Sequence, residues 1–167
     1  MEAPYDRWAE ESVVGCAIAS RRGADLAAYQ VNPPDFYNPK HARLFAAAVE
    51  LNASRDEDLS VIVAAMANAT VLHTALCGCV ICGAPLEDDI RSAVVAERTG
   101  VELEEVTRLV RERPVVYDTN GRFAARVIDA AVRRRVMTAA ATVYNALGTG
   151  ARLEELRPAL SVLGVSA

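Results

Sequence analysis

Four side chains that could bind a metal ion lie close together in the middle of the chain. The spacing H-x3-C-x-C-x2-C joins His73, Cys77, Cys79 and Cys82. Imidazole and thiolate groups are the ligands that zinc prefers, but structural zinc sites usually draw ligand pairs from separated segments. The surrounding sequence is apolar, and reduced cysteine packs as a small apolar side chain. We therefore interpret this stretch as core, with a zinc site and a redox-active cysteine pair as the alternatives.

A second group of reactive side chains surrounds the other histidine, His41. Asp35 and Tyr37 precede it on a short connector, so an acid–base pair could form there. Packing at the start of a helix is the simpler interpretation. The single lysine, Lys40, follows a proline and stands in no glycine-rich phosphate-binding loop. These patterns predict a protein that is not an enzyme and that needs no nucleotide, metal or other cofactor.

Composition predicts an all-α fold. The chain has 167 residues, of which 52% are hydrophobic and 5% aromatic, so the core must consist mainly of Ala, Val and Leu. Alanine favours helix, and strand-like alternation is absent. A net charge of −4 disfavours direct, general binding to nucleic acid. No signal peptide or membrane-spanning run is recognisable, so we expect a soluble cytoplasmic protein with reduced cysteines.

Helical patterns predict a small globular domain. We expect a first helix over 6–20, capped by Asp6, and a short second helix over 24–30 after a break at Gly23. A third helix should begin after Asn38 as the N-cap and Pro39 as the first helical residue. Two aromatic residues before it should pack under its start, and four apolar positions should form its buried face. The inward-facing side chains predicted for the first and third helices are Trp8, Val14, Ala17, Ile18, Phe36, Tyr37, Leu44, Phe45, Ala48 and Leu51.

The longest periodic pattern predicts a helical hairpin at the C-terminal end. A helix over 122–147 should end at Gly148-Thr149-Gly150, and a shorter helix with leucines on one side should follow. The apolar stripe of the long helix is more continuous than a small domain could cover by itself, which predicts a homo-oligomer, dimer or higher. We expect its interface to include Phe123, Val127, Ile128, Val132, Val136, Val143 and Leu147. The predicted domains are therefore 1–116, globular, and 117–167, the hairpin.

A DNA-binding alternative rests on residues 86–113. Two predicted helices, 86–98 and 102–112, are joined by Thr99-Gly100-Val101, as in a helix-turn-helix. Arg108, Arg111 and Arg113 would then face DNA. Four glutamates on the same helix oppose contact with phosphate groups. Two packed helices of an all-α domain have the same pattern.

Two motifs resemble a known family. Glu10-Glu11-Ser12-Val13-Val14-Gly15 is followed by Asp35-Phe36-Tyr37-Asn38-Pro39-Lys40-His41 and then by Leu44-Phe45. In order and spacing this resembles the N-terminal domain of the bacterial DnaB-type replicative helicase. The resemblance covers about residues 8–68 and, in the hairpin, 115–163, whereas 70–113 is divergent. The matched motif positions with a structural role are Gly15, Asp35, Phe36, Tyr37, His41 and Phe45.

The resemblance implies a replication-associated protein-interaction module without the ATPase motor domain. In the family, the globular domain and its hairpin build the N-terminal collar of the helicase and contact the primase. A freestanding counterpart would be expected to self-associate through the hairpin and to bind a replicative helicase, its loader or a primase. A phage or mobile-element origin would fit such a module.

Overall fold

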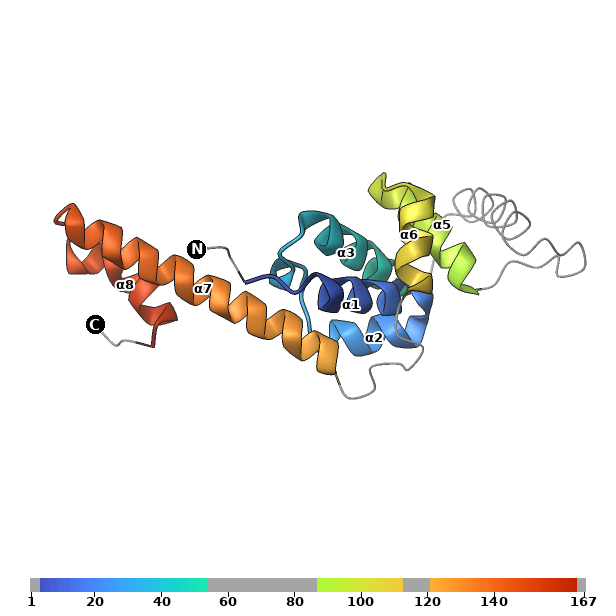
Figure 1. Ribbon diagram of the computed structural model, residues 1–167, viewed down its shortest axis with the longest axis horizontal. Helices are drawn as coiled ribbons and strands as arrows, with labels where there is room; N and C mark the ends of the chain where they lie inside the picture. The colour runs from blue at the N-terminus through green and yellow to red at the C-terminus, as the bar shows by residue number, and fades with distance from the viewer. Residues whose placement is uncertain (1–3, 54–86, 113–120, 165–167) are drawn as a thin grey trace, which may run out of the picture. The chain divides into compact units, whose positions relative to one another are not determined.

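The computed structural model describes residues 4–53, 87–112 and 121–164 (Figure 1). Every regular element within these ranges is helical, so the all-α prediction is confirmed. The predicted zinc ligands and Arg113 lie outside the described residues. The elements are α1 (Arg7–Ala19), α2 (Arg21–Ala28), the short 3-10 helix η1 (Pro33–Asp35), α3 (Pro39–Ala53), α5 (Glu87–Thr99), α6 (Leu103–Arg111), α7 (Arg122–Gly148) and α8 (Leu153–Val162).

Helix α1 begins where the sequence predicted and packs at the centre of the globular unit. The Asp6 carboxylate caps it by accepting a hydrogen bond from the Ala9 N–H at 3.0 Å. Val14, Ala17 and Ile18 are fully buried, as predicted. Trp8 was wrongly predicted to face inward and is 52% exposed. Ser12, Gly15 and Ala19 lie at nearly the same angle about the helix and are buried. Trp8 is exposed because it lies in the first turn of α1, near the end of the helix.

Helix α2 begins earlier than predicted, because the break falls at Ser20 and not at Gly23. The Ser20 side chain caps α2 by accepting a hydrogen bond from the Gly23 N–H at 3.1 Å. Gly23 lies inside the helix, where a Cβ atom would come within 2.0 Å of the Cys16 carbonyl oxygen. This glycine therefore allows α1 and α2 to pack closely.

Helix α3 confirms the predicted start and buried face. Asn38 Oδ1 accepts a hydrogen bond from the Lys40 N–H at 2.9 Å, and Leu44, Phe45, Ala48 and Leu51 are buried. Phe36 packs against Phe45 with the ring centroids 5.0 Å apart. Tyr37 was wrongly predicted to pack beneath the helix and is about half exposed. The backbone is extended at Phe36, so its side chain and that of the next residue point in opposite directions.

Helices α5 and α6 complete the globular unit and form the predicted helix pair. The turn between them contains Gly100 with a φ of +66°, a left-handed conformation that glycine adopts without steric cost. Val106 and Leu109 of α6 are buried. The buried Arg91 of α5 donates from Nε to the Ile18 carbonyl at 2.7 Å, and from Nη2 to the carbonyls of Ala17 at 3.2 Å and Ala48 at 3.5 Å. Arg91 thus joins α5 to α1 and α3.

The chain divides into two compact units, with the division inside α7. One unit is Asp6–Val127, and the other comprises Met1–Tyr5 and Ile128–Ala167. In the second unit α7 and α8 form the predicted hairpin, with Gly150 in the left-handed conformation at the turn and Leu156 of α8 buried. Arg134 Nη1 donates a hydrogen bond to the Pro4 carbonyl at 2.9 Å within this unit. None of the helices in the described ranges is long and apolar enough to span a membrane.

Candidate protein-interaction site

The two sequence motifs meet at a buried carboxylate, Glu10, in the first turn of α1. Glu10 Oε1 accepts a hydrogen bond from the Tyr37 N–H at 2.5 Å. Its Oε2 accepts from the Asn38 N–H at 3.3 Å and lies 2.9 Å from His41 Nδ1. Glu10 is 1% exposed and His41 3% exposed. The carboxylate therefore ties α1 to the connector and to the first turn of α3.

The hydrogen-bond network assigns His41 a structural role. Asn38 Oδ1 is the helix cap, which leaves Asn38 Nδ2 to donate to His41 Nε2 at 3.4 Å. In that arrangement the hydrogen of the neutral imidazole is on His41 Nδ1, and this N–H group donates a hydrogen bond to Glu10. The Asp35 carboxylate accepts from the Asn32 N–H at 2.9 Å at the start of η1. The buried His41 side chain therefore joins the first turn of α3 to Glu10 of α1.

Sequence reasoning missed Glu10, although its position carried a signal. Glu10 falls among Ala9, Val13 and Val14 on the buried side of α1, where a charged side chain needs hydrogen-bond partners. The other motif positions have core roles, because Gly15 of α1 and Phe45 of α3 are both buried. The motifs therefore encode the joint between α1 and α3.

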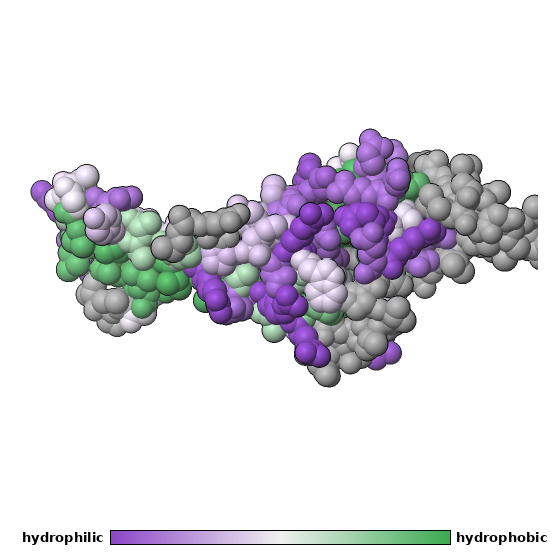
Figure 2. Space-filling view, viewed as in Figure 1, coloured by the Kyte–Doolittle hydropathy of each residue, from purple (hydrophilic) through white to green (hydrophobic). Residues whose placement is uncertain are grey.

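The exposed apolar face of the hairpin is the most distinctive surface of the described residues. Figure 2 shows hydrophobic surface gathered over α7 and α8, whereas the surface over the globular unit in this view is mostly hydrophilic. Val132, Val136 and Leu147 of the predicted stripe are 45%, 40% and 65% exposed. Ile128 and Val143 are half-buried. Three further exposed apolar side chains on the hairpin were not predicted for the interface, namely Tyr144, Leu153 and Val162.

The first two positions of the predicted interface belong to the globular unit. Val127 is 1% exposed. The Phe123 ring packs edge-on against Trp8, with the centroids 4.7 Å apart. The Arg126 guanidinium lies 5.8 Å from the centre of the Trp8 ring and forms an ion pair with Asp6. The available apolar face therefore begins beyond Val127.

The arginines of the DNA-binding alternative are partly engaged by carboxylates. Arg108 Nη1 forms an ion pair with Glu112 at 2.6 Å, and its Nη2 lies 3.3 Å from Glu11. Burial works to raise the pKa of the Glu11 carboxyl, but hydrogen bonds from Arg7 and Arg108 outweigh it and the pKa lies below its usual value. Arg111 is exposed at the end of α6. The DNA-binding alternative stays a prediction.

The fold and the buried joint define a helical domain with an exposed apolar hairpin. Comparison with known proteins relates its first half to one family: residues 2–74 match the family model described as the DnaB-like helicase N terminal domain. The resemblance seen in the motifs is thereby confirmed for this stretch, which is similar to a module of replication helicases. No curated protein and no solved structure matched the chain. The resemblance of the hairpin, which lies beyond residue 74, stays a prediction.

Proposed function

We propose that the protein is a non-catalytic interaction module of DNA replication that self-associates through its hairpin. The observation that carries this proposal is the exposed apolar face of α7 and α8 in a chain whose first half is similar to a helicase N-terminal domain. Contiguous apolar surface on a soluble protein is typical of a protein–protein interface. The proposed partners beyond a second copy are a replicative helicase, its loader or a primase.

The arrangement of exposed side chains supports pairing of hairpins. Val132, Val136, Val143 and Leu147 are separated by four, seven and four residues, so they fall within a narrow strip along α7. Leu153 and Val162 add exposed apolar surface on α8. Two copies that pack these faces together would remove apolar area from water, which favours association by about 25 cal/mol per Å² before the costs of binding.

Light scattering after size exclusion, over a series of micromolar protein concentrations, tests the proposal. We expect the wild-type chain to elute as a dimer or larger assembly. The double variant Val136→Glu and Leu147→Glu should be monomeric, because it would place carboxylates in the apolar contact. Thr138→Glu is the matched control, since position 138 is exposed on the opposite side of the same helix and this variant should associate as the wild type does.

The same experiment with added proteins tests the partners. We expect a new complex when the wild-type chain is mixed with the replicative helicase, the helicase loader or the primase of its host. A monomeric wild type that forms no complex with any of the three would contradict the proposed function. An assembly that persists in the Val136→Glu and Leu147→Glu variant would contradict the hairpin as its interface.

A further inference from the structure

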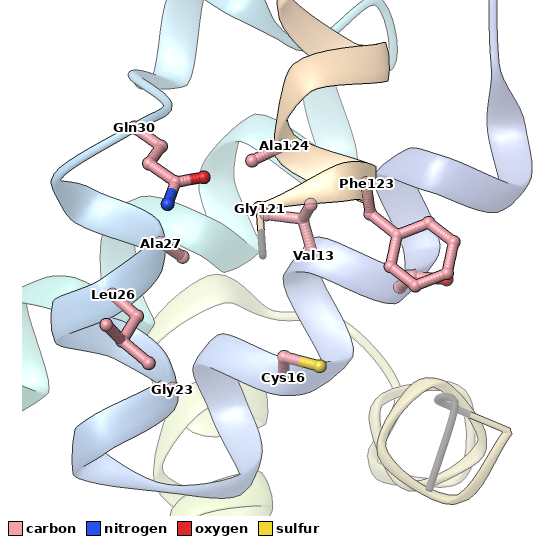
Figure 3. A pocket seen from close by; sticks show the side chains of 10 residues that line it. Val13, Cys16, Gly23, Leu26, Ala27, Gln30, Gly121, Phe123 and Ala124 are labelled. Atoms are coloured by element: carbon pink, nitrogen blue, oxygen red, sulfur yellow. The ribbon is translucent and has the colours of Figure 1, made fainter. Parts of the chain in front are cut away.

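A small apolar pocket lies in the globular unit between α1, α2 and the start of α7. Figure 3 shows Val13 and Cys16 of α1 on one side, with Phe123 of α7 beside Val13, and Leu26 and Ala27 of α2 on the other side. Leu26 is 41% exposed and forms part of the rim. The hairpin unit contributes no residue to this pocket, so occupation of the pocket does not require self-association through the hairpin.

The size of the pocket limits what it can hold. The centres of water molecules can occupy a volume of about 40 Å³ inside the pocket. The lining of the pocket is mostly apolar. This space corresponds to roughly three water molecules. One branched aliphatic side chain of the size of leucine would replace those waters, whereas an indole ring is too large. Poorly held water in an apolar pocket is favourably displaced by an apolar group.

The walls of the pocket are set by close backbone packing. Gly23 lets α2 approach the Cys16 carbonyl, because any Cβ atom there would collide with it. Gly121 has a φ of +66° and lies against the Gln30 side chain, where a Cβ atom would come within 2.3 Å of the Gln30 Oε1. The pocket is therefore preformed, and a ligand would not need to open it.

Exposed arginines without acidic partners stand beside the pocket on two of its helices. Arg22 lies four residues before Leu26, which places it on the same face of α2 as the rim. Arg122 lies between the lining residues Gly121 and Phe123. Both arginines are exposed, and neither forms an ion pair in the described part of the chain.

The acidic residue of this helix is already bonded elsewhere. The Asp25 carboxylate accepts a hydrogen bond from the Asn52 side chain of α3. The positive charges of Arg22 and Arg122 are therefore available to an anionic group outside the chain. Complementary charges at the rim of an interface favour encounter with the right partner and fix its position.

We propose that this pocket is a docking site for an acidic segment of a partner protein, which inserts one leucine-sized side chain. The aliphatic side chain fills the space between Val13, Ala27 and Phe123. Carboxylates that flank it in the partner pair with Arg22 and Arg122. Apolar anchors in preformed pockets commonly supply most of the affinity of such interfaces, and rim charges supply specificity.

The probe is a synthetic peptide with one leucine in a row of glutamates. Two measurements report its binding to the protein. The first is fluorescence anisotropy of the labelled peptide. The second is the rate of Cys16 alkylation by iodoacetamide, measured by mass spectrometry of the tryptic peptide, because Cys16 lines the pocket. We expect the peptide to bind and to slow alkylation of Cys16. Replacing its leucine by alanine should weaken binding about tenfold or more.

Variants of the protein locate the contact. Ala27→Phe should fill the pocket and abolish protection of Cys16, and the double reversal Arg22→Glu and Arg122→Glu should weaken binding while leaving the pocket itself intact. Arg98→Glu is the matched control, because Arg98 is exposed on α5 and does not line the pocket. Far-UV circular dichroism establishes that each variant is folded, and the double reversal tests the proposal even if Ala27→Phe unfolds.

Three results would overturn the proposal. The first is an unchanged rate of Cys16 alkylation at saturating acidic peptide. The second is equal protection by the alanine peptide or by a peptide with lysines in place of the glutamates. The third is protection that rises with the concentration of the protein itself in the absence of peptide, which would make a second copy the occupant.

Discussion

Replacing Glu10 by glutamine should weaken the globular unit far more than the same change one residue later. Glu10→Gln keeps the shape of the side chain but removes its charge and one of its two acceptor oxygens. In the wild type, both oxygens accept hydrogen bonds, one from Tyr37 and the other from Asn38 and His41. The NH2 group of the new amide must take the place of one of these oxygens. In one orientation the Tyr37 N–H group loses its acceptor, and in the other the Asn38 N–H group loses its acceptor.

The size of the effect follows from these contacts. A buried donor left without an acceptor costs about 1–3 kcal/mol, and hydrogen bonds to a charged group contribute about 1.5–3 kcal/mol each. The imidazole of His41 could change its tautomer to accept from the new NH2 group. Its Nε2–H would then need Asn38 Oδ1, which caps α3, and loss of that cap costs about 1 kcal/mol. We therefore expect Glu10→Gln to lower the free energy of unfolding by about 2–4 kcal/mol.

Urea unfolding followed by fluorescence measures this directly. The single tryptophan, Trp8, lies in α1 only two residues from Glu10, so it reports on the globular unit. Glu11→Gln is the control, because Glu11 is partly exposed and pairs with arginines at the surface. Such pairs contribute about 0–1 kcal/mol. Equal unfolding free energies for the two variants would refute the role assigned to the buried carboxylate.

Two further predictions concern packing and pH. Gly23→Ala should destabilise the globular unit by about 1–3 kcal/mol in the same urea assay, because its Cβ would collide with the Cys16 carbonyl. Gly148→Ala, in the hairpin unit, should be neutral or slightly stabilising when urea unfolding is followed by circular dichroism, because a Cβ there meets no atom within 4 Å. Because the pKa of Glu11 lies below its usual value in the folded protein, its contribution to stability should be fully present above the usual pKa and should disappear as the pH falls through the lowered one. Urea midpoints of the wild type and Glu11→Gln measured across the acidic range should therefore converge at low pH, and a constant difference would contradict the pairing with Arg108.

Local signals made the helices predictable. Asn38 and Pro39 define the start of α3 through chemistry confined to one turn, and the spacing of Leu44, Phe45 and Leu51 defines its buried face. The end of α7 is likewise set by Gly148, its last residue, and by Gly150 in the turn that follows. Such features depend on the sequence within one or two turns, so a single sequence is sufficient to find them.

Features that depend on distant segments were less predictable. The burial of Glu10 becomes understandable only when donors 27 and 31 residues away are in place. Gly23 reads as a helix break in the sequence, and only the approach of α1 gives it a packing role. Trp8 is apolar enough to suggest a core position, but it lies in the first turn of α1, where about half of its surface stays exposed. The pocket beside Cys16 has no sequence signal, because three separate helices form it.

Arg91 has a consequence for where the domain can be divided. It lies beyond residue 74, where the family match ends, yet it donates to backbone carbonyls of Ala17, Ile18 and Ala48 inside the matched region. Removing α5 would leave the carbonyls at the end of α1 without this donor and would expose the apolar surface that α5 and α6 cover. A fragment that ends at residue 74 is therefore not expected to fold autonomously. We therefore expect α1, α3 and α5 to form their common core in one cooperative step. The contact between Arg91 and Ile18 in this core closes a loop of more than seventy residues.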